Sequence, residues 1–492
     1  MQTIKIRCLA LVVLIVLASS VFIADGRAQK KGDYLFFASA DASEAWVRFR
    51  GPNGSGVSPD RGFPVEFGTR KNVLWSRSVP EGKSSPVLTQ KHIFLTAHQG
   101  DKLVILCLER RTGNTVWERF IPRGRKEFEH ALNSAAAPTP TTDGENVYAF
   151  FRDFGLISFS PTGKERWRTP LGPFSSLWGL SISPILVDDK VILTVDQLSN
   201  SYIAAFGQAD GKLKWKTERR GFALNHATPL IRQTPNGHNE ILVLGPQQIV
   251  AYHARTGDQL WSVSGLGAGS VGSPLLSGHV VFSVSNAPET TPSFEASLQK
   301  SDKNGDQVLS PDEFSNDENP PVLKAIGDLF GNRDGVVEAE DWRQAWQEWS
   351  GKSGLFATAL ESIPSSAKTE PRSLWTYARS LPRVSSPLLY DGVLYIVANG
   401  GILTALNPKT GEGFKTDRLR GAIENYFASP VAADGKVFLT SESGKVVVIR
   451  ASPEWEILAV NDLGEDSYAT PALSKGNILI RTSKTLFCFG KN

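Results

Sequence analysis

The sequence is poor in the groups on which several large classes of protein depend. It has only 3 cysteines among 492 residues, too few for a disulfide framework. Its 53 Lys and Arg nearly balance its 50 Asp and Glu, for a net charge of +3, so it lacks the basic surface that nucleic-acid binding requires. After the N-terminal residues, no apolar run approaches the roughly 20 residues that cross a bilayer. Disulfide-stapled, nucleic-acid-binding and polytopic membrane proteins are therefore excluded.

Common catalytic motifs are also missing. The chain contains neither HExxH nor GxSxG. The glycine-rich residues 51–56 have no following Lys-Ser/Thr and no strand-to-helix context, so they predict turns rather than a phosphate loop. Hydrolase and nucleotide chemistry of these kinds therefore has no support in the sequence.

Residues 1–28 are predicted to be a signal peptide. Lys5 and Arg7 precede the apolar residues 8–24, and small residues surround a plausible cleavage point after Ala28. An uncleaved membrane anchor is the alternative. We expect an exported protein, periplasmic or extracellular, with no transmembrane anchor after cleavage and with residues 29–71 as an N-terminal extension.

Eight Ser-Pro or Thr-Pro pairs mark an internal repeat. Successive prolines lie 41–54 residues apart, except for one interval of 113. Between them the pattern is strand-like, as in residues 93–95, 103–106 and 116–117, and four short strands in about 43 residues are typical of a propeller blade. The pairs are Ser85-Pro86, Thr139-Pro140, Ser183-Pro184, Thr228-Pro229, Ser273-Pro274, Ser386-Pro387, Ser429-Pro430 and Thr470-Pro471.

An aromatic column runs in phase with this repeat. The eighth unit lacks its last strand and its aromatic residue, and residues 72–75 supply both through Trp75. We therefore predict an all-β fold, an eight-bladed β-propeller closed by an N-terminal strand, with blades in residues 72–286 and 354–492; closure removes the open sheet edge. The other members of the column are Trp117, Trp167, Trp215, Trp261, Trp375, Phe414 and Trp455.

One unit shows the pattern A-x4-T-G-x3-W clearly, as Ala251, Thr256-Gly257 and Trp261. This pattern resembles the PQQ-like β-propeller repeat family, which includes quinoprotein alcohol dehydrogenases and an outer-membrane-protein assembly lipoprotein. The resemblance implies that the aromatic residues wedge between neighbouring blades. It implies little about function, because many activities share the fold. Cys107 and Cys488 fall in a column of small buried residues and are expected to be packed thiols rather than a disulfide.

The long interval holds an insertion in blade 5, residues 287–353, that resembles an EF-hand pair. Its first loop has oxygen donors at the positions that bind Ca²⁺, although Gln307 replaces the glycine usual at the sixth position. This substitution is expected to weaken affinity without abolishing it. The predicted ligands are Asp302, Asn304, Asp306, the Val308 carbonyl, Ser310 and Glu313.

A second, weaker loop follows the first. Phe330 occupies its first position and offers no side-chain oxygen. Helices are expected over residues 294–301, 322–330 and 339–349; three tryptophans on one face of the last predict the core of the insertion and its seam with the propeller, with a partner-binding groove as the alternative. The candidate ligands of the second loop are Asn332, Asp334, Val336, Glu338 and Asp341.

Residues just before each Ser-Pro or Thr-Pro pair should gather at one end of the central channel. Convergent polar groups at a concave mouth are the usual place for a ligand, although polar side chains also line any wet funnel. The candidates are Lys83, His130, Asn133, Trp178, His226, Arg383, Glu424, Asn425, Tyr426, Asp466 and Tyr468.

The sequence is compatible with three functions. Quinoprotein dehydrogenases stack their quinone between a tryptophan and a vicinal disulfide, and this chain has no adjacent cysteines and no CxxCH haem motif. We therefore expect a non-catalytic scaffold with bound Ca²⁺ and without PQQ, which binds an envelope or extracellular protein, a glycan or a small polar ligand. A PQQ-dependent alcohol or sugar dehydrogenase is the alternative, and a ligand sensor rigidified by calcium is a third possibility.

Overall fold

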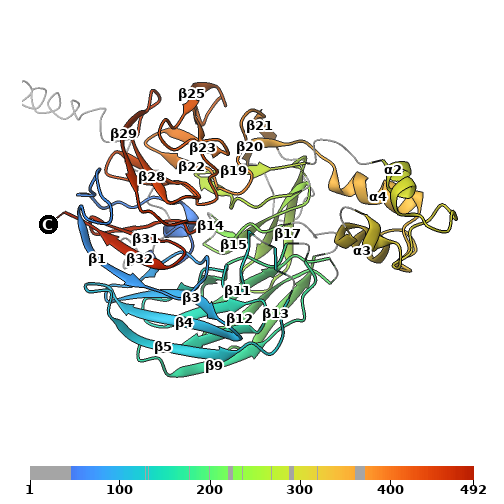
Figure 1. Cartoon of the computed structure of the whole chain (residues 1–492), viewed down its shortest axis with the longest axis horizontal. Helices are drawn as coiled ribbons and strands as arrows, with labels where there is room; N and C mark the ends of the chain where they lie inside the picture. Colours follow the sequence, from blue (N-terminus) through green and yellow to red (C-terminus); the bar gives the residue numbers. More distant parts are fainter. Residues whose placement is uncertain are drawn as a thin grey trace, which may run out of the picture. The chain divides into compact units, whose positions relative to one another are not determined.

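The computed structural model describes residues 46–491 apart from residues 128, 131, 177, 199, 220–224, 235–236, 268, 288–292, 318–319 and 361–371. The predicted signal peptide lies outside the described residues. Eight four-stranded antiparallel sheets form a ring of blades (Figure 1). The prediction of an eight-bladed propeller is confirmed.

In blades 1 to 4 the strands follow one another outward from the channel in sequence order. Their bounds are β2 (Val87–Leu88), β3 (His92–Gln99), β4 (Lys102–Glu109) and β5 (Thr115–Pro122); β6 (Thr141–Thr142), β7 (Val147–Phe151), β8 (Gly155–Phe159) and β9 (Glu165–Pro170); β10 (Ile185–Val187), β11 (Lys190–Val195), β12 (Tyr202–Gly207) and β13 (Leu213–Glu218); β14 (Leu230–Gln233), β15 (Asn239–Gly245), β16 (Gln248–His253) and β17 (Gln259–Ser264).

Blades 5 to 8 have the same order, but the fourth strand of blade 8 comes from the N-terminal side of the chain. Their bounds are β18 (Leu275–Ser277), β19 (Val280–Ser285), β20 (Gly354–Ala359) and β21 (Arg372–Tyr377); β22 (Leu388–Tyr390), β23 (Val393–Ala398), β24 (Ile402–Leu406) and β25 (Gly413–Arg418); β26 (Val431–Ala433), β27 (Lys436–Thr440), β28 (Lys445–Arg450) and β29 (Glu456–Asp462); β30 (Ala472–Ser474), β31 (Asn477–Arg481), β32 (Thr485–Phe489) and β1 (Val73–Ser78).

Strand β1 closes the ring as the sequence predicts. It pairs antiparallel with β32, with Val73 opposite Phe489 and Trp75 opposite Cys488, and the two strands lie side by side in Figure 1. The middle strands of a blade are buried on both faces, as in β12, because neighbouring blades cover them. The outermost strands face solvent, as β13 does. The core is therefore distributed between the blades.

The Ser-Pro and Thr-Pro repeat has a direct structural cause. In every blade the backbone N–H of the Ser or Thr donates to the hydroxyl oxygen of its counterpart in the next blade, over 2.9–3.3 Å. The last of these bonds, from Thr470 N to Ser85 Oγ, joins blade 8 to blade 1. Only a residue with a hydroxyl near the backbone makes this contact, so the eight residues form a closed hydrogen-bonded ring around the channel.

The aromatic column joins the blades at their outer strands. Trp167 of blade 2 packs on the turn of blade 3: its Nε1 donates to Gln208 O over 2.8 Å, and a Cβ on Gly211 would lie 2.4 Å from its ring. The turn needs glycine for this close approach and for its φ of 65°. Trp75, Trp117, Trp215 and Trp375 make the same contact with Gly113, Gly163, Gly257 and Gly411.

Two members of the predicted column are wrong. In blade 6, Lys415 rather than Phe414 occupies the register of the tryptophans, opposite Ala405, and Phe414 is 39% exposed. Trp455 precedes β29 and lies in the turn of blade 7. Lys415 donates to Trp455 O over 2.7 Å and lies 4.3 Å from the centroid of its ring. A cation–π contact therefore replaces the tryptophan–glycine contact at this joint.

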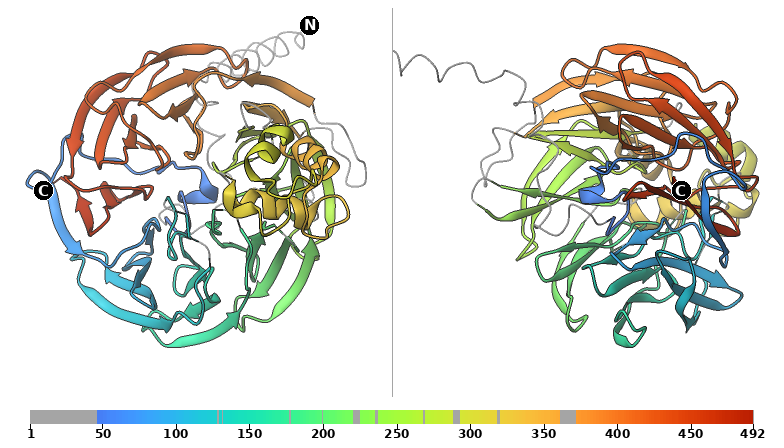
Figure 2. Two further views of the ribbon diagram at one scale, coloured as in Figure 1. Left: turned by 45° about the vertical axis from the view of Figure 1, so that its right-hand side comes forward. Right: turned by 90° about the vertical axis from the view of Figure 1, so that its left-hand side faces the viewer.

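The chain before β1 crosses the channel. The N-terminal strap, residues 46–58, contains η2 (Pro52–Gly54), which lies near the centre of the ring in Figure 2. Its backbone bonds to the innermost strands of blades 1, 2 and 7, and the Asn53 side chain bonds to Ile231 of blade 4. The predicted turns are present, with positive φ at Arg50, Gly51, Asn53, Gly54 and Gly56. The strap therefore braces strands from opposite sides of the ring.

The inserted module, residues 287–353, interrupts blade 5 between β19 and β20 and contains the three expected helices. They are α2 (Phe294–Ser301), α3 (Pro320–Leu329) and α4 (Ala339–Trp349), with the short η3 (Phe314–Asn316) between the first two. Helix α3 begins two residues before the prediction, because Pro320 and Pro321 are tolerated in a first helical turn. Trp342 and Trp349 are buried in the module's own core, and Leu198 of blade 3 packs against that core.

The two cysteines left in the propeller are free and buried. Cys107 and Cys488 lie opposite Trp117 and Trp75 in adjacent strands, and burial raises the pKa of each thiol to about 12. Since the thiolate is the reactive form, we expect neither to react with Ellman's reagent in the native protein and both to react in guanidinium chloride. Rapid labelling of the native protein would contradict this burial.

Candidate functional site

The channel mouth is the end of the ring at which each innermost strand begins. Because successive strands of a blade run in opposite directions, the connections between second and third strands return to the same face. Loops before the Ser or Thr of each blade and these second connections therefore surround the mouth. The inserted module leaves blade 5 at such a connection and so lies on this face, where Gln247 Nε2 donates to Gln347 O over 3.1 Å.

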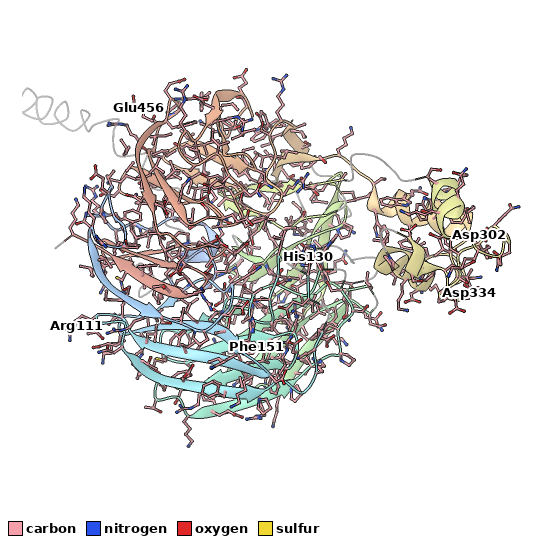
Figure 3. All side chains as sticks on the ribbon, in the orientation of Figure 1. Arg111, His130, Phe151, Asp302, Asp334 and Glu456 are labelled. Atoms are coloured by element: carbon pink, nitrogen blue, oxygen red, sulfur yellow. The ribbon has the colours of Figure 1, made fainter. Side chains whose placement is uncertain are left out.

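Blades 2 to 4 bring four of the predicted residues to one side of the mouth. Asn133 Nδ2 donates to Trp178 O and Gly179 O over 2.9 and 3.0 Å, which fixes the loop that carries Trp178. The Trp178 ring is 41% exposed and meets His226 edge-on, with ring centroids 5.8 Å apart. Burial lowers the pKa of His226 to about 4, so this histidine is neutral at physiological pH. His130 holds its own loop by accepting from Leu132 N and lies toward the middle of the ring in Figure 3.

The opposite side of the mouth is hollowed between blades 6, 7 and 8. This mouth pocket has a volume of about 460 Å³. It combines carboxylates with amide and hydroxyl groups and one exposed apolar side chain, Ile423, which is 55% exposed. Its lining residues are Gly400, Ile423, Glu424, Asn425, Glu442, Ser443 and Asp466.

The carboxylates of the mouth pocket are held by short polar contacts. Burial opposes the ionisation of Glu424, but hydrogen bonds from Lys445, Ser441 and Ser443 lower its pKa to about 2. The Lys445 Nζ to Glu424 Oε1 distance is 2.8 Å. Glu424 is therefore ionised at every physiological pH.

A second carboxylate is held by two neutral donors. Glu442 accepts from Asn425 Nδ2 and from Tyr468 Oη, each over 3.0 Å. Burial and the Glu442 carboxylate raise the pKa of Tyr468 to about 12, so the phenol keeps its proton and donates it. Tyr468 also stacks on Phe427, and Lys83 Nζ lies 4.1 Å from the Tyr468 centroid. The stacked rings of Phe427 and Tyr468 therefore lie next to the Glu442 carboxylate, although neither ring lines the pocket.

Not all predicted mouth residues belong to this site. Tyr426 is 1% exposed in the core between blades 6 and 7, and its phenol donates to Ala422 O over 2.9 Å, so it cannot reach a ligand. Arg383 is exposed before β22 and does not line the pocket. Sequence reasoning missed Glu442 and Ser443, because they lie between β27 and β28 rather than before a Ser-Pro pair. The alternation of strand direction could have placed that loop at the mouth.

A larger hollow, of about 810 Å³, lies beside β1 and blade 1. Its walls include Glu81, His98, Glu118 and Arg123, and His98 Nε2 lies 3.9 Å from Glu81 Oε1. Burial lowers the pKa of His98. This hollow extends from the mouth-side loops, at Glu81 and Gly100, to the outer strand β5. The mouth pocket is lined only by loops around the channel mouth, so we take it as the candidate site.

The first EF-hand-like loop is folded around its own backbone amides. Asp302 accepts from Gly305 N and Gln307 N over 2.7 and 3.0 Å, and Asp306 accepts from Val308 N over 3.1 Å. Gln307 has a φ of 66°, so the strain expected from replacing glycine at the sixth position is present. The loop nevertheless keeps the sharp turn that this position requires.

Glu313 closes the loop from its far end. Its carboxylate accepts from Lys303 N over 2.8 Å and from both Ser310 N and Ser310 Oγ over 2.9 Å. These bonds lower the pKa of Glu313 to about 2, and the bond from Ser310 N contributes most. Glu313 is buried and ionised, at the position from which a bidentate calcium ligand is expected.

The second loop repeats the backbone of the first. Asp334 accepts from Val336 N over 2.9 Å, and Asp341 accepts from Glu338 N over 2.9 Å, as Glu313 does from Ser310 N. Leu309 and Val337 exchange two backbone hydrogen bonds of 3.0 and 2.9 Å, which pair the loops. Asp302 and Asp334, one from each loop, both lie at the end of the inserted module in Figure 3.

The donor set of the first loop is all oxygen, as hard Ca²⁺ prefers. Three carboxylates, an amide, a hydroxyl and a carbonyl are available from Asp302 to Glu313. Within the described part of the chain, no three His, Cys, Asp or Glu side chains converge on one point; the loop carboxylates accept from backbone amides. The residues fit the ion in chemistry and in loop backbone.

Comparison with known proteins gives the family. The sequence model of the PQQ-like family described as outer membrane protein assembly factor BamB matches residues 65–176, 104–237 and 199–492. The chain belongs to this family. No curated protein matches the sequence, so no relative assigns its function.

Solved structures of BamB-like and quinoprotein propellers share the fold. BamB from Moraxella catarrhalis has a TM-score of 0.54 at 12% identity, over 85% of this chain and 99% of that one. A europium-containing methanol dehydrogenase has a TM-score of 0.56 at 10% identity, over 91% and 98%. The quinohemoprotein alcohol dehydrogenase of Comamonas testosteroni has a TM-score of 0.56 at 12% identity, over 92% and 82%. At these identities the likeness shows the fold alone.

Among the described residues no helix is long and apolar enough to span a membrane.

Proposed function

We propose that this BamB-family propeller is an exported, non-catalytic binding protein, periplasmic or extracellular, whose channel mouth holds a macromolecular partner, with a calcium-binding module beside it. The mouth pocket carries the proposal. It offers the ionised Glu424 and the hydrogen-bonded Glu442 next to the stacked rings of Phe427 and Tyr468. Carboxylates beside amide and hydroxyl groups suit a basic or amide-rich segment of a protein better than a hydrophobic ligand. A glycan or small polar ligand could use the same groups.

A quinoprotein dehydrogenase is the second candidate, favoured by the exposed Trp178 and by the fold shared with methanol dehydrogenase. The residues at hand do not provide the usual holder for PQQ. Trp178 meets His226 edge-on instead of facing a disulfide, and the two free cysteines, Cys107 and Cys488, are buried between strands. These residues therefore do not fit PQQ as a redox cofactor.

Site-specific photocrosslinking tests the binding proposal. A photoactivatable amino acid at Ile423, exposed in the mouth pocket, is expected to capture a discrete partner in the native cell. The matched control carries it at Val116, which is 48% exposed on the outer strand β5. Capture at Ile423 should be lost in Glu442→Gln, which weakens the negative pocket. Equal capture at both positions would show that the mouth is not the binding surface.

Reconstitution with PQQ and Ca²⁺ tests the alternative. We expect no dye reduction with primary alcohols or aldose sugars. Substrate-dependent dye reduction that disappears in Trp178→Ala would make the protein a dehydrogenase and overturn the proposal.

A further inference from the structure

Two buried arginines enter the channel from the N-terminal strap. Arg48 is 6% exposed and Arg50 is fully buried. Arg48 Nη2 donates to Pro229 O of blade 4, and Arg50 Nη2 donates to Pro387 O of blade 6 over 2.8 Å. These prolines directly follow Thr228 and Ser386, two of the eight Ser and Thr residues that form the closed hydrogen-bonded ring around the channel, hereafter the hydroxyl ring. Both guanidinium groups therefore lie next to that ring.

The two charges are not compensated by the described part of the chain. No ion pair among the described residues includes Arg48 or Arg50, and the Nε and Nη1 atoms of both have no acceptor there. Burial lowers the pKa of Arg48 to about 10. Burial and, to a smaller extent, repulsion from Arg48 lower the pKa of Arg50 to about 9. Both side chains remain positive at neutral pH. A buried charge without a partner is strongly unfavourable.

Two of the other buried arginines meet that requirement in different ways. Arg219 forms a bidentate pair with Asp196, at 2.6 and 2.9 Å. Arg481 has no carboxylate partner, but its two Nη atoms reach oxygens of Ser84, Thr96 and Pro80 over 2.7–3.2 Å. Arg48 and Arg50 have neither a carboxylate nor a comparable set of oxygens.

The surroundings are rich in donors. Each hydroxyl of the ring uses its oxygen to accept a backbone N–H, and its own hydrogen can donate; that of Ser429 already donates to Ser386 Oγ over 3.2 Å. Thr228 and Ser386 of this ring directly precede the two prolines that Arg48 and Arg50 contact. Convergent donors with positive charge are the chemistry of an anion site.

We propose that the channel binds a small inorganic anion, a halide or a tetrahedral oxyanion, at Arg48 and Arg50, where these side chains of the strap reach the hydroxyl ring. The anion supplies the missing negative charge and accepts from the free guanidinium nitrogens. It thereby couples the strap to the blades, so the site is structural and separate from the mouth pocket. The proposal does not depend on the partner that the mouth binds.

The first test uses the unmodified full-length protein. Melting is followed at constant ionic strength while fluoride is replaced by bromide, or separately by sulfate. A saturable rise of Tm of at least about 2 °C with one anion supports the site and identifies its class. Tm values that do not saturate, or that are equal in all salts, overturn it.

The second test locates the ion and removes its ligands. Crystals soaked in sodium bromide are expected to show an anomalous peak at hydrogen-bond distance from Arg48 or Arg50. Arg50→Met should abolish the anion dependence of Tm, whereas Arg481→Met, which removes a buried arginine whose two Nη atoms already donate to oxygens, should keep it. If Arg50→Met does not fold, the peak and the salt series of the unmodified protein decide. Water alone at the guanidinium groups, or peaks only on the surface as an adventitious ion, would contradict the proposal.

Discussion

Replacement of Trp75 by alanine is expected to lower the free energy of unfolding by about 3 kcal/mol, the lower end of the range for removing a large aromatic side chain. Trp75 lies on β1, the strand that closes the ring, and packs on Gly113 of blade 1. It also lies opposite Cys488. Its loss therefore loosens both β1 against blade 8 and blade 8 against blade 1.

Phe414→Ala is the matched control for this experiment. Phe414 is also an aromatic residue on an outermost strand, β25, but it is 39% exposed and lies outside the register of the tryptophans. Its replacement should change stability by no more than about 0.5 kcal/mol. Guanidinium unfolding of the three proteins measures the difference. Equal losses for Trp75→Ala and Phe414→Ala would show that the joint between blades does not depend on the tryptophan register.

The number of blades could be predicted because each blade repeats the same physical requirement. The hydroxyl ring needs a hydroxyl beside the backbone in every blade. Its eight Ser or Thr residues therefore recur in the sequence as a repeat. The contacts between the tryptophans and the turns of neighbouring blades are less regular. At blade 6 the joint is made by Lys415 on Trp455, and a search for aromatic residues selects Phe414 instead, one position from the correct register.

The mouth was only partly predictable, for a topological reason. Residues before each Ser-Pro pair could be placed there because the innermost strand begins at the mouth. Glu442 and Ser443 arrive through a different connection, between β27 and β28, that carries no repeat signal. Tyr426 has the right position in the sequence, but a short local hydrogen bond to Ala422 holds its ring in the core. The roles of Arg48 and Arg50 depend on how the strap crosses the ring, which no local pattern indicates.

The first EF-hand-like loop could be located in the sequence, because its candidate ligands follow one another at fixed spacing; its calcium binding stays a prediction. The structure adds the reason that the two loops support each other. Leu309 and Val337 pair their backbones, and both loops have positive φ at the fourth and sixth positions, at Gly305 and Gln307 and at Arg333 and Gly335. The second loop thus helps to hold the first loop in a defined conformation.

Among substitutions in the first loop, removal of the Glu313 carboxylate is expected to reduce the calcium affinity most. We expect the full-length protein to bind one Ca²⁺ at the first loop in the weak range typical of extracellular modules, roughly 10⁻⁴–10⁻³ M. Glu313→Gln should reduce this affinity at least about tenfold, because it removes a charge and the bidentate ligand that closes the loop. Titration calorimetry on the intact protein, after treatment with a chelator, measures the change.

Asp312→Asn is the control for this variant, since it removes the same charge one residue away. Asp312 is exposed, and its side chain occupies the eleventh position of the loop, which supplies no ligand. Asp312→Asn should therefore keep nearly the calcium affinity of the unmodified protein, whereas Glu313→Gln should lose it. The same contrast is expected in thermal melts, because an ion that binds only the folded module stabilises it. Equal heats and equal melting shifts for the unmodified protein and for Glu313→Gln would show that the first loop does not bind calcium and that its carboxylates serve only to cap the backbone.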